Sequence, residues 1–161
     1  DEETARDYII FEKPDLTVVV LDATALERNL NLALQVMELT EKVIVCINLI
    51  DEAEKMGIKI NEKILMRRLG VPVIKISARN KTGLPLLLDT IERVITGAIP
   101  CSPLKITYDE ETEQKIESLL PKVQSVFGEK VPARWLSLRL LDGDKKLLEE
   151  LMQRHLKKEV S

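Results

Sequence analysis

Aromatic residues and cysteines are scarce in this sequence. Phe, Trp and Tyr together make up 3% of the 161 residues, so any core must be aliphatic and built from Leu, Ile and Val. The two cysteines, Cys46 and Cys101, have no CxxC or histidine partner, which argues against a metal centre or a disulfide framework. We therefore expect a reducing compartment.

A positive excess of charge and a long apolar run are also lacking. The 24 basic residues stand against 27 acidic ones, and a net charge of −3 provides no surplus for binding a nucleic-acid backbone. We therefore expect no nucleic-acid partner. No apolar stretch approaches the about 18–20 residues that a membrane-spanning helix requires.

Two phosphate-binding patterns are absent from the printed sequence. Neither G-x-x-x-x-G-K-[ST] nor D-x-x-G occurs in the 161 residues. In nucleotide-hydrolysing proteins such loops hold the phosphates and Mg²⁺. We therefore name no catalytic residue and no metal ligand, and we expect this chain alone to be inactive as an enzyme.

The first part of the chain alternates between strand and helix patterns. Short β-branched runs predict buried parallel strands at 16–21, 43–47 and 73–76. Helices are expected before the first strand, at 2–11, and after each strand. The capping box Thr24-x-x-Glu27 opens the first of these, and Asn61 caps one that ends at Gly70.

A further helix follows Gly83, with Pro85 in its first turn, and its expected buried face is Leu84, Leu87, Leu88, Ile91 and Val94. Strand–helix alternation of this kind is typical of crossover connections in a parallel sheet. The expected fold class is α/β, with a partial parallel sheet of three strands and crossover helices, followed by a small all-helical subdomain.

Only helical periods follow the two prolines of the segment 99–104. Asp109 caps a helix with an apolar stripe from Ile116 to Phe127, and Trp135 anchors a second helix. The third helix is expected to bury Leu148, Leu151, Met152 and His155. The predicted organisation is an α/β part at 1–98, a linker at 99–104 and a helical subdomain at 105–161, whose completeness the sequence leaves open.

Polar residues stand where two of the strands end. Asn48, Leu49 and Asp51 follow the second strand, and Ser77, Ala78 and Arg79 follow the third, about 29 residues later with one short helix expected between them. Ligands of open parallel sheets bind at this edge. A carboxylate at position 51 can accept both N1–H and N2–H2 of guanine, a fork that adenine cannot make.

The other positions complete this hypothesis of a guanine-binding site. Asn48 would donate to the N7 or O6 edge and tie the two loops together, and Ser77 would hold the Asp51 carboxylate. The backbone N–H of Ala78 would meet O6. The alternative is an Asx turn at Asn48 and Asp51, with Ser77 capping a loop. Under that alternative the chain is a nucleotide-free α/β scaffold or interaction module.

Three strings resemble the cytosolic GTP-binding domain of the prokaryotic ferrous-iron transport protein B family. They begin at Asp1 (DEETARDY), Asp22 (DATALERNL) and Asp51 (DEAEKMGIKI). Looser similarity to the helical spacer domain of that family appears at Pro132 (PARWL) and Leu141 (LDGD). Another translation-factor-like GTPase is the alternative within the same class, and the strings at 22–30 and 51–60 argue against it.

The resemblance implies that the partial sheet is of the P-loop GTPase type. It also implies a cofactor, a set of partners and a location. Family members bind GTP and GDP, hydrolyse GTP slowly, and are joined in one polypeptide to a membrane channel for Fe²⁺ on whose cytoplasmic side this domain lies. It implies that Asp1 falls in the second switch, and that the phosphate loop and the Mg²⁺ ligands are not in this chain. Leu49 stands where the general GTPase pattern has a lysine. Homo-oligomer formation stays open.

Overall fold

The computed structural model describes residues 2–160, and the chain divides into two compact units, Asp1–Lys105 and Ile106–Ser161. We call them the α/β unit and the helical unit. Asp1, which the resemblance assigns to the second switch, lies outside the described residues. No helix of the described part is long and apolar enough to cross a membrane.

Three parallel strands form the centre of the α/β unit, and they are β1 (Thr17–Asp22), β2 (Val43–Asn48) and β3 (Val73–Lys75). Strand β2 lies in the middle, and its residues 43–47 are all buried. A central parallel strand is covered on both faces, which explains why this run has no polar residue. The predicted strands are confirmed, with β1 displaced by one residue.

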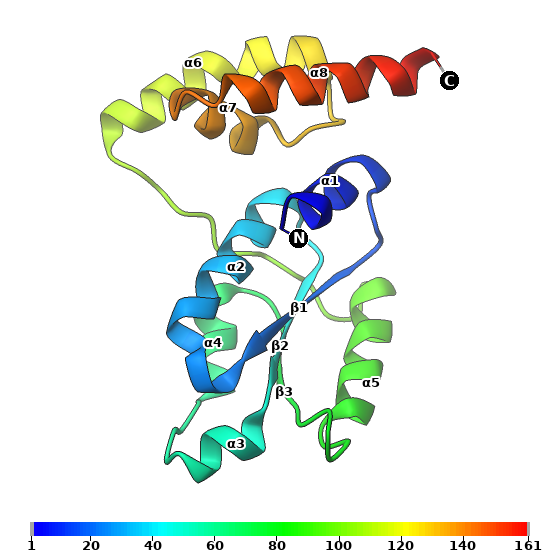
Figure 1. The fold of residues 1–161 in the computed structure, drawn as a ribbon, viewed down its shortest axis with the longest axis vertical. Coiled ribbons are helices and arrows are strands. Elements are labelled where there is room, and N and C mark those ends of the chain that lie inside the picture. Colours follow the sequence, from blue (N-terminus) through cyan, green and yellow to red (C-terminus); the bar gives the residue numbers. More distant parts are fainter. Residues whose placement is uncertain (1, 161) are drawn as a thin grey trace. The chain divides into compact units, whose positions relative to one another are not determined.

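Helices cover both faces of this sheet (Figure 1). Helices α2 (Leu26–Leu39) and α4 (Glu62–Leu69) pack on one face, and α5 (Leu84–Ile95) packs on the other. Helix α1 (Glu2–Glu12) contacts α2 and buries Ile9 and Ile10. The α/β fold class predicted from the alternation of patterns is thus confirmed.

The start of α2 differs from the prediction. The capping box at Thr24 was wrong, because Asp22 makes the cap: its Oδ1 accepts from the Thr24 N–H at 2.8 Å. This cap opens a short 3-10 helix, η1 (Ala23–Ala25), and α2 begins after it with Ala25 as an N-cap that makes no side-chain bond. Asp22 is the last residue of β1, and its side chain lies ahead of Thr24 in position to cap the helix.

A helix that was not predicted, α3 (Ile50–Lys55), follows β2 directly. Two helices therefore lie between the second and third strands, not one. The helix has six residues and buries only Ala53, so it carries no apolar stripe that a sequence pattern could detect. The predicted cap at Asn61 and the stop at Gly70 of α4 are both confirmed.

The expected buried face of α5 is correct except at one position. Val94 is buried, and Leu84, Leu87 and Ile91 pack against the core of their side of the sheet. Leu88, however, is 67% exposed. It lies one helical turn along from Leu84, at the border of the stripe, where sequence periodicity cannot decide between core and solvent.

The segment 99–104 is anchored to the α/β unit by its backbone. The N–H of Ser102 donates to the carbonyl of Gly70 at 2.9 Å, and the N–H of Leu104 donates to the carbonyl of Leu69 at 2.8 Å. Gly70 has φ of +75°, and a Cβ there would overlap the Ser102 carbonyl. The chain therefore passes closely over the end of α4 before it leaves the α/β unit.

The described part of the helical unit contains three helices, α6 (Glu110–Phe127), α7 (Ala133–Leu141) and α8 (Lys145–Val160). Asp109 caps α6 as predicted, with its Oδ1 accepting from the Thr112 N–H at 2.8 Å. Trp135 is buried as predicted. In α8 the buried residues include Leu147, Leu151 and His155, whereas Met152 is 42% exposed, so its expected burial was wrong.

An ion pair joins α6 to α7, and both of its residues also bond to the backbone at the start of the helical unit. Arg134 on α7 donates to both carboxylate oxygens of Glu113 on α6, at 2.8 and 2.7 Å, and to the carbonyl of Ile106 at 3.0 Å. The Tyr108 N–H also donates to Glu113, at 2.9 Å. Bonds from Arg134 and Tyr108 hold the pKa of Glu113 down at about 2.

Candidate nucleotide-base site

The predicted base-binding residues lie at one edge of the sheet. Asp22 and Asn48 are register partners at the ends of β1 and β2, and Ser77 follows β3 by two residues. Figure 1 shows α3 and the loop that precedes α5 at this same end. Because parallel strands point the same way, their carboxyl ends bring residues distant in sequence together.

Hydrogen bonds connect the exits of β2 and β3. The side-chain Oδ1 of Asn48 accepts from the backbone N–H of Ala78 at 3.1 Å, across 30 residues. The Ile76 N–H donates to the Ile47 carbonyl at 2.8 Å, and the Ile50 N–H donates to the Ile76 carbonyl at 3.3 Å. The amide of Asn48 thus ties the two loops together through its oxygen.

Leu49 has a backbone conformation that L-residues rarely adopt. Its φ of 63° and ψ of 33° are left-handed, and it is the N-cap of α3. Such a conformation costs about 1–2 kcal/mol for a residue with a Cβ. Strained residues of this kind cluster at ligand sites. The turn at Leu49 separates Asn48, at the end of β2, from Asp51, in the first turn of α3.

Asp51 carries a carboxylate with one oxygen paired and one oxygen buried. Oδ2 accepts from the side-chain amide of Asn80 at 3.3 Å. Oδ1 is buried, and the Ser77 hydroxyl and the backbone N–H of Glu52 also bond to this carboxylate. Burial raises the pKa of Asp51, but the Ser77 hydroxyl and the backbone N–H of Glu52 outweigh that effect and hold the pKa below its ordinary value. The group is therefore an anionic acceptor at neutral pH.

The loop after β3 is closed on itself. The backbones of Ser77 and Thr82 exchange two hydrogen bonds of 3.1 Å each, and the Ser77 Oγ accepts from the Asn80 N–H at 3.4 Å. Lys81 has a φ of 58°, and Gly83 has a φ of 80° where a Cβ would overlap the Lys75 carbonyl. Ser77 itself is buried, which fixes the base of the loop below Asp51.

Arg79 points away from the carboxylate of Asp51 and pairs with a different one. Its side chain is 76% exposed, and Nη1 lies 3.5 Å from Oε1 of Glu52, which also lies 3.6 Å from the Lys55 ammonium. Exposed pairs of this kind contribute little to stability. Of the six predicted residues, Arg79 is thus the one least fixed by its surroundings.

Asn80 is a residue that the sequence reasoning missed. It lies in the closed loop, one position beyond Arg79, and its side chain spans 29 residues to reach Asp51. An asparagine in a short loop after a strand is a common turn residue, so the sequence offered no reason to separate it from its neighbours. Only the folded loop shows which way its amide points.

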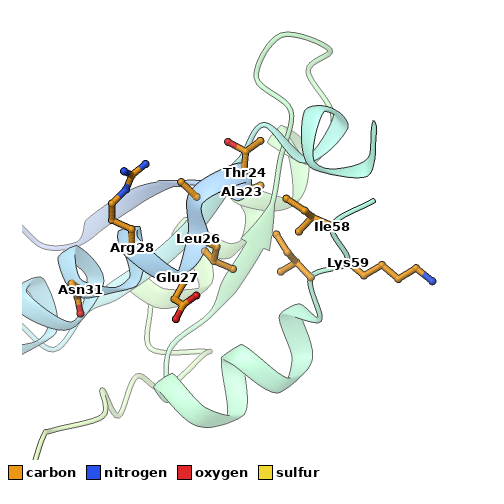
Figure 2. Close-up of a pocket in the computed structure, with 10 residues that line it drawn as sticks. Ala23, Thr24, Leu26, Glu27, Arg28, Asn31, Ile58 and Lys59 are labelled. Atoms are coloured by element: carbon orange, nitrogen blue, oxygen red, sulfur yellow. The ribbon is translucent and has the colours of Figure 1, made fainter. Parts of the chain in front are cut away.

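A groove of about 740 Å³ lies beside this edge, between the start of α2 and the segment 58–60 (Figure 2). Its lining includes Thr24, Glu27, Arg28 and Lys59, and none of the predicted base-binding residues lines it. Asp22, next to it, accepts from the Thr24 hydroxyl at 2.7 Å and from its N–H, which hold the pKa of Asp22 below its ordinary value. Asp22 therefore acts as a cap.

The described residues contain no group of three or more His, Cys, Asp or Glu side chains that could hold a metal ion. His155, which was expected to be buried with the apolar stripe of its helix, is 9% exposed, and its ring meets Phe127 edge to face with centroids 5.2 Å apart. It packs inside the helical unit.

Comparisons with known proteins match both units. The family described as ferrous iron transport protein B matches residues 1–91, and the FeoB cytosolic helical domain matches residues 108–161. The Fe(2+) transporter FeoB of Escherichia coli K12 is 36% identical over 150 residues, which cover 89% of this chain and 18% of that protein. The present chain thus spans about a fifth of its length.

Solved structures agree with these matches. The cytosolic domain of the T. maritima FeoB iron transporter in a GDP form superposes with a TM-score of 0.82 at 30% identity, covering 92% of this chain and 58% of that one. The FeoB G domain of Methanococcus jannaschii superposes with a TM-score of 0.57 at 46% identity, covering 58% of this chain and 60% of that one. The chain belongs to the ferrous iron transport protein B family, and it carries part of the G domain and of the helical domain.

Proposed function

We propose that this chain reads the guanine base in the nucleotide-binding region of a ferrous iron transporter. Asp51 accepts N1–H and N2–H2 of guanine, Asn48 donates through Nδ2 to N7, and the Ala78 N–H is shared between Asn48 and O6. Ser77 supports Asp51 from below, and Leu49 covers part of the base. Arg79 follows Ala78 in the same loop, where it pairs with Glu52.

The observation that carries this proposal is the bond of 3.1 Å from the Ala78 N–H to Asn48 Oδ1. It fixes the Asn48 amide so that its donor group faces away from the loop, and it holds the two loops at one edge. The Asp51 carboxylate supports the same assignment, since the bonds from Ser77 and Glu52 hold its pKa below the ordinary value and keep it an anionic acceptor. The GDP form of the T. maritima relative adds support for a guanine nucleotide as ligand.

The proposed organisation follows the family. Residues 1–98 form the C-terminal half of a GTP-binding domain, 99–104 connect it, and 105–161 form the helical spacer. The same polypeptide continues into the membrane portion that conducts Fe²⁺, on whose cytoplasmic side this region lies. GTP binding and slow hydrolysis in the whole protein are coupled to Fe²⁺ uptake. Mg²⁺ and phosphate contacts come from residues that are not among these 161.

The test uses nucleoside monophosphates in place of triphosphates, because the sequence contains no phosphate loop. GMP added at millimolar concentration to the ¹⁵N-labelled chain should shift the amide signals of Ala78, Asn80 and Glu52, and AMP should not. Asp51→Ala is expected to abolish the GMP response, and Asp89→Ala, on the exposed side of α5, serves as the control. Equal responses to GMP and AMP would refute guanine reading and favour the scaffold alternative.

A further inference from the structure

We propose that Asn80 is the positioning residue for the base-reading carboxylate. By donating from Nδ2 to Oδ2 of Asp51, it restricts the rotation of the carboxylate that accepts N1–H and N2–H2 of guanine. This inference rests on the proposed function of the same site. Its ligand class is a base that carries both donors, as opposed to one that carries N1–H alone.

The carboxylate benefits from such support in addition to the bonds from the Ser77 hydroxyl and the Glu52 N–H. The terminal torsion of an aspartate is broad, so the plane of the two oxygens turns easily. Asp51 lies in the first turn of a six-residue helix whose N-cap, Leu49, makes no side-chain bond. A fork to guanine demands one orientation of that plane, since both bonds must be formed together.

Asn80 can supply this orientation because its own position is fixed. Its N–H donates to the Oγ of buried Ser77 at 3.4 Å, and the loop around it is closed by the two bonds between Ser77 and Thr82. A third bond, from the Lys81 N–H to the Ala78 carbonyl at 3.3 Å, tightens the turn. The side-chain amide is therefore presented to Asp51 from a loop with few remaining degrees of freedom.

The bond leaves room for the base. Each carboxylate oxygen has two acceptor positions, so Oδ2 can accept from Asn80 and from one guanine donor at the same time. The Ser77 hydroxyl lowers the energy of the anion from the buried side.

The experiment compares GMP with IMP, which lacks the N2 amino group, on the 161-residue chain. Asn80→Leu removes the donor at similar size, Asn80→Gln retains an amide, and Lys81→Ala is the matched control in the same loop. Dissociation constants come from ¹H–¹⁵N titrations at millimolar nucleotide. The signals of Ser77 and Thr82 report whether the loop stays closed, and Asn80→Ser is the second variant if Asn80→Leu opens it.

We expect Asn80→Leu to weaken GMP by about three- to tenfold, the effect of one modest hydrogen bond, and to weaken IMP by less. The preference for GMP over IMP should then fall, Asn80→Gln should restore part of it, and Lys81→Ala should match the wild type. Equal weakening of GMP and IMP, or no change, overturns the role of Asn80 and leaves the site intact. No response of the wild type to GMP overturns the site and this inference together.

Discussion

Replacing Gly70 by alanine tests how the chain leaves the α/β unit. Gly70 has a φ of +75°, and a Cβ there would overlap the Ser102 carbonyl, so the variant must release the segment above it. The backbone strain costs about 1–2 kcal/mol. Loss of the bonds from Ser102 to Gly70 and from Leu104 to Leu69 adds about 0.5–1.5 kcal/mol each, which gives about 2–5 kcal/mol in all.

Gly57→Ala is the matched control. Gly57 has nearly the same φ, +76°, but no atom lies within 4 Å of an added Cβ. It therefore measures the backbone strain alone, about 1–2 kcal/mol. The two variants should differ by at least about 1 kcal/mol, which corresponds to at least about 4 °C in melting temperature for a domain of this size.

Two measurements decide the outcome. Thermal unfolding followed by circular dichroism gives the two melting temperatures, and amide hydrogen exchange reports directly on the Ser102 and Leu104 N–H groups. Gly70→Ala should remove the protection of both groups, and Gly57→Ala should keep it. Equal melting temperatures together with retained protection in Gly70→Ala would refute the reasoning, because they would show that a Cβ at position 70 does not displace the segment 99–104.

Three further predictions concern the base site and the helical unit. Asp51→Asn should shift preference from guanine to xanthine nucleotides by about 10–100-fold, because an amide can donate to the C2 carbonyl of xanthine. Unchanged GMP affinity in calorimetry would contradict the role of Asp51 in binding guanine. The 161-residue chain should bind GTP only weakly, and a micromolar dissociation constant in the same assay would show that phosphate contacts are not needed. Glu113 has a pKa of about 2 against an ordinary 4.5, so its stabilisation is complete above pH 4.5 and is lost as the pH falls towards 2. Trp135 fluorescence should follow this loss. Glu113→Gln should make the stability of the helical unit less sensitive to pH between 4.5 and about 2. Glu111→Gln, on the exposed face of α6, is the control.

Much of the fold follows from local chemistry that a sequence displays directly. The buried strand at 43–47, the cap at Asn61 and the stop at Gly70 each depend on residues within a few positions of one another. The cap after β1 was assigned to the wrong residue because Asp22 and Thr24 both have side chains that can cap a helix. The position at which β1 ends makes Asp22 the cap. Helix α3 was missed because its residues show no apolar period.

The candidate site divides in the same way. The strand exits at Asn48 and Ser77 were predictable, since parallel strands end together and polar residues mark their ends. The link from Asn80 to Asp51 was not, because it depends on the closure of a loop and on the left-handed turn at Leu49. The contact between Asn80 and Asp51 joins side chains 29 residues apart. It depends on the folded backbone, so the pattern of a single sequence does not predict it.

Strand β1 has a consequence for handling the chain on its own. It stands at the edge of the three-stranded order and pairs only with β2 among residues 2–160. Its sequence, TVVVLD, is β-branched and free of proline and lysine, and Val20 is 56% exposed. Unpaired edge strands of this composition can pair with strands of other molecules. Aggregation of the isolated chain should therefore begin at β1, and a lysine in place of Val20 should delay it.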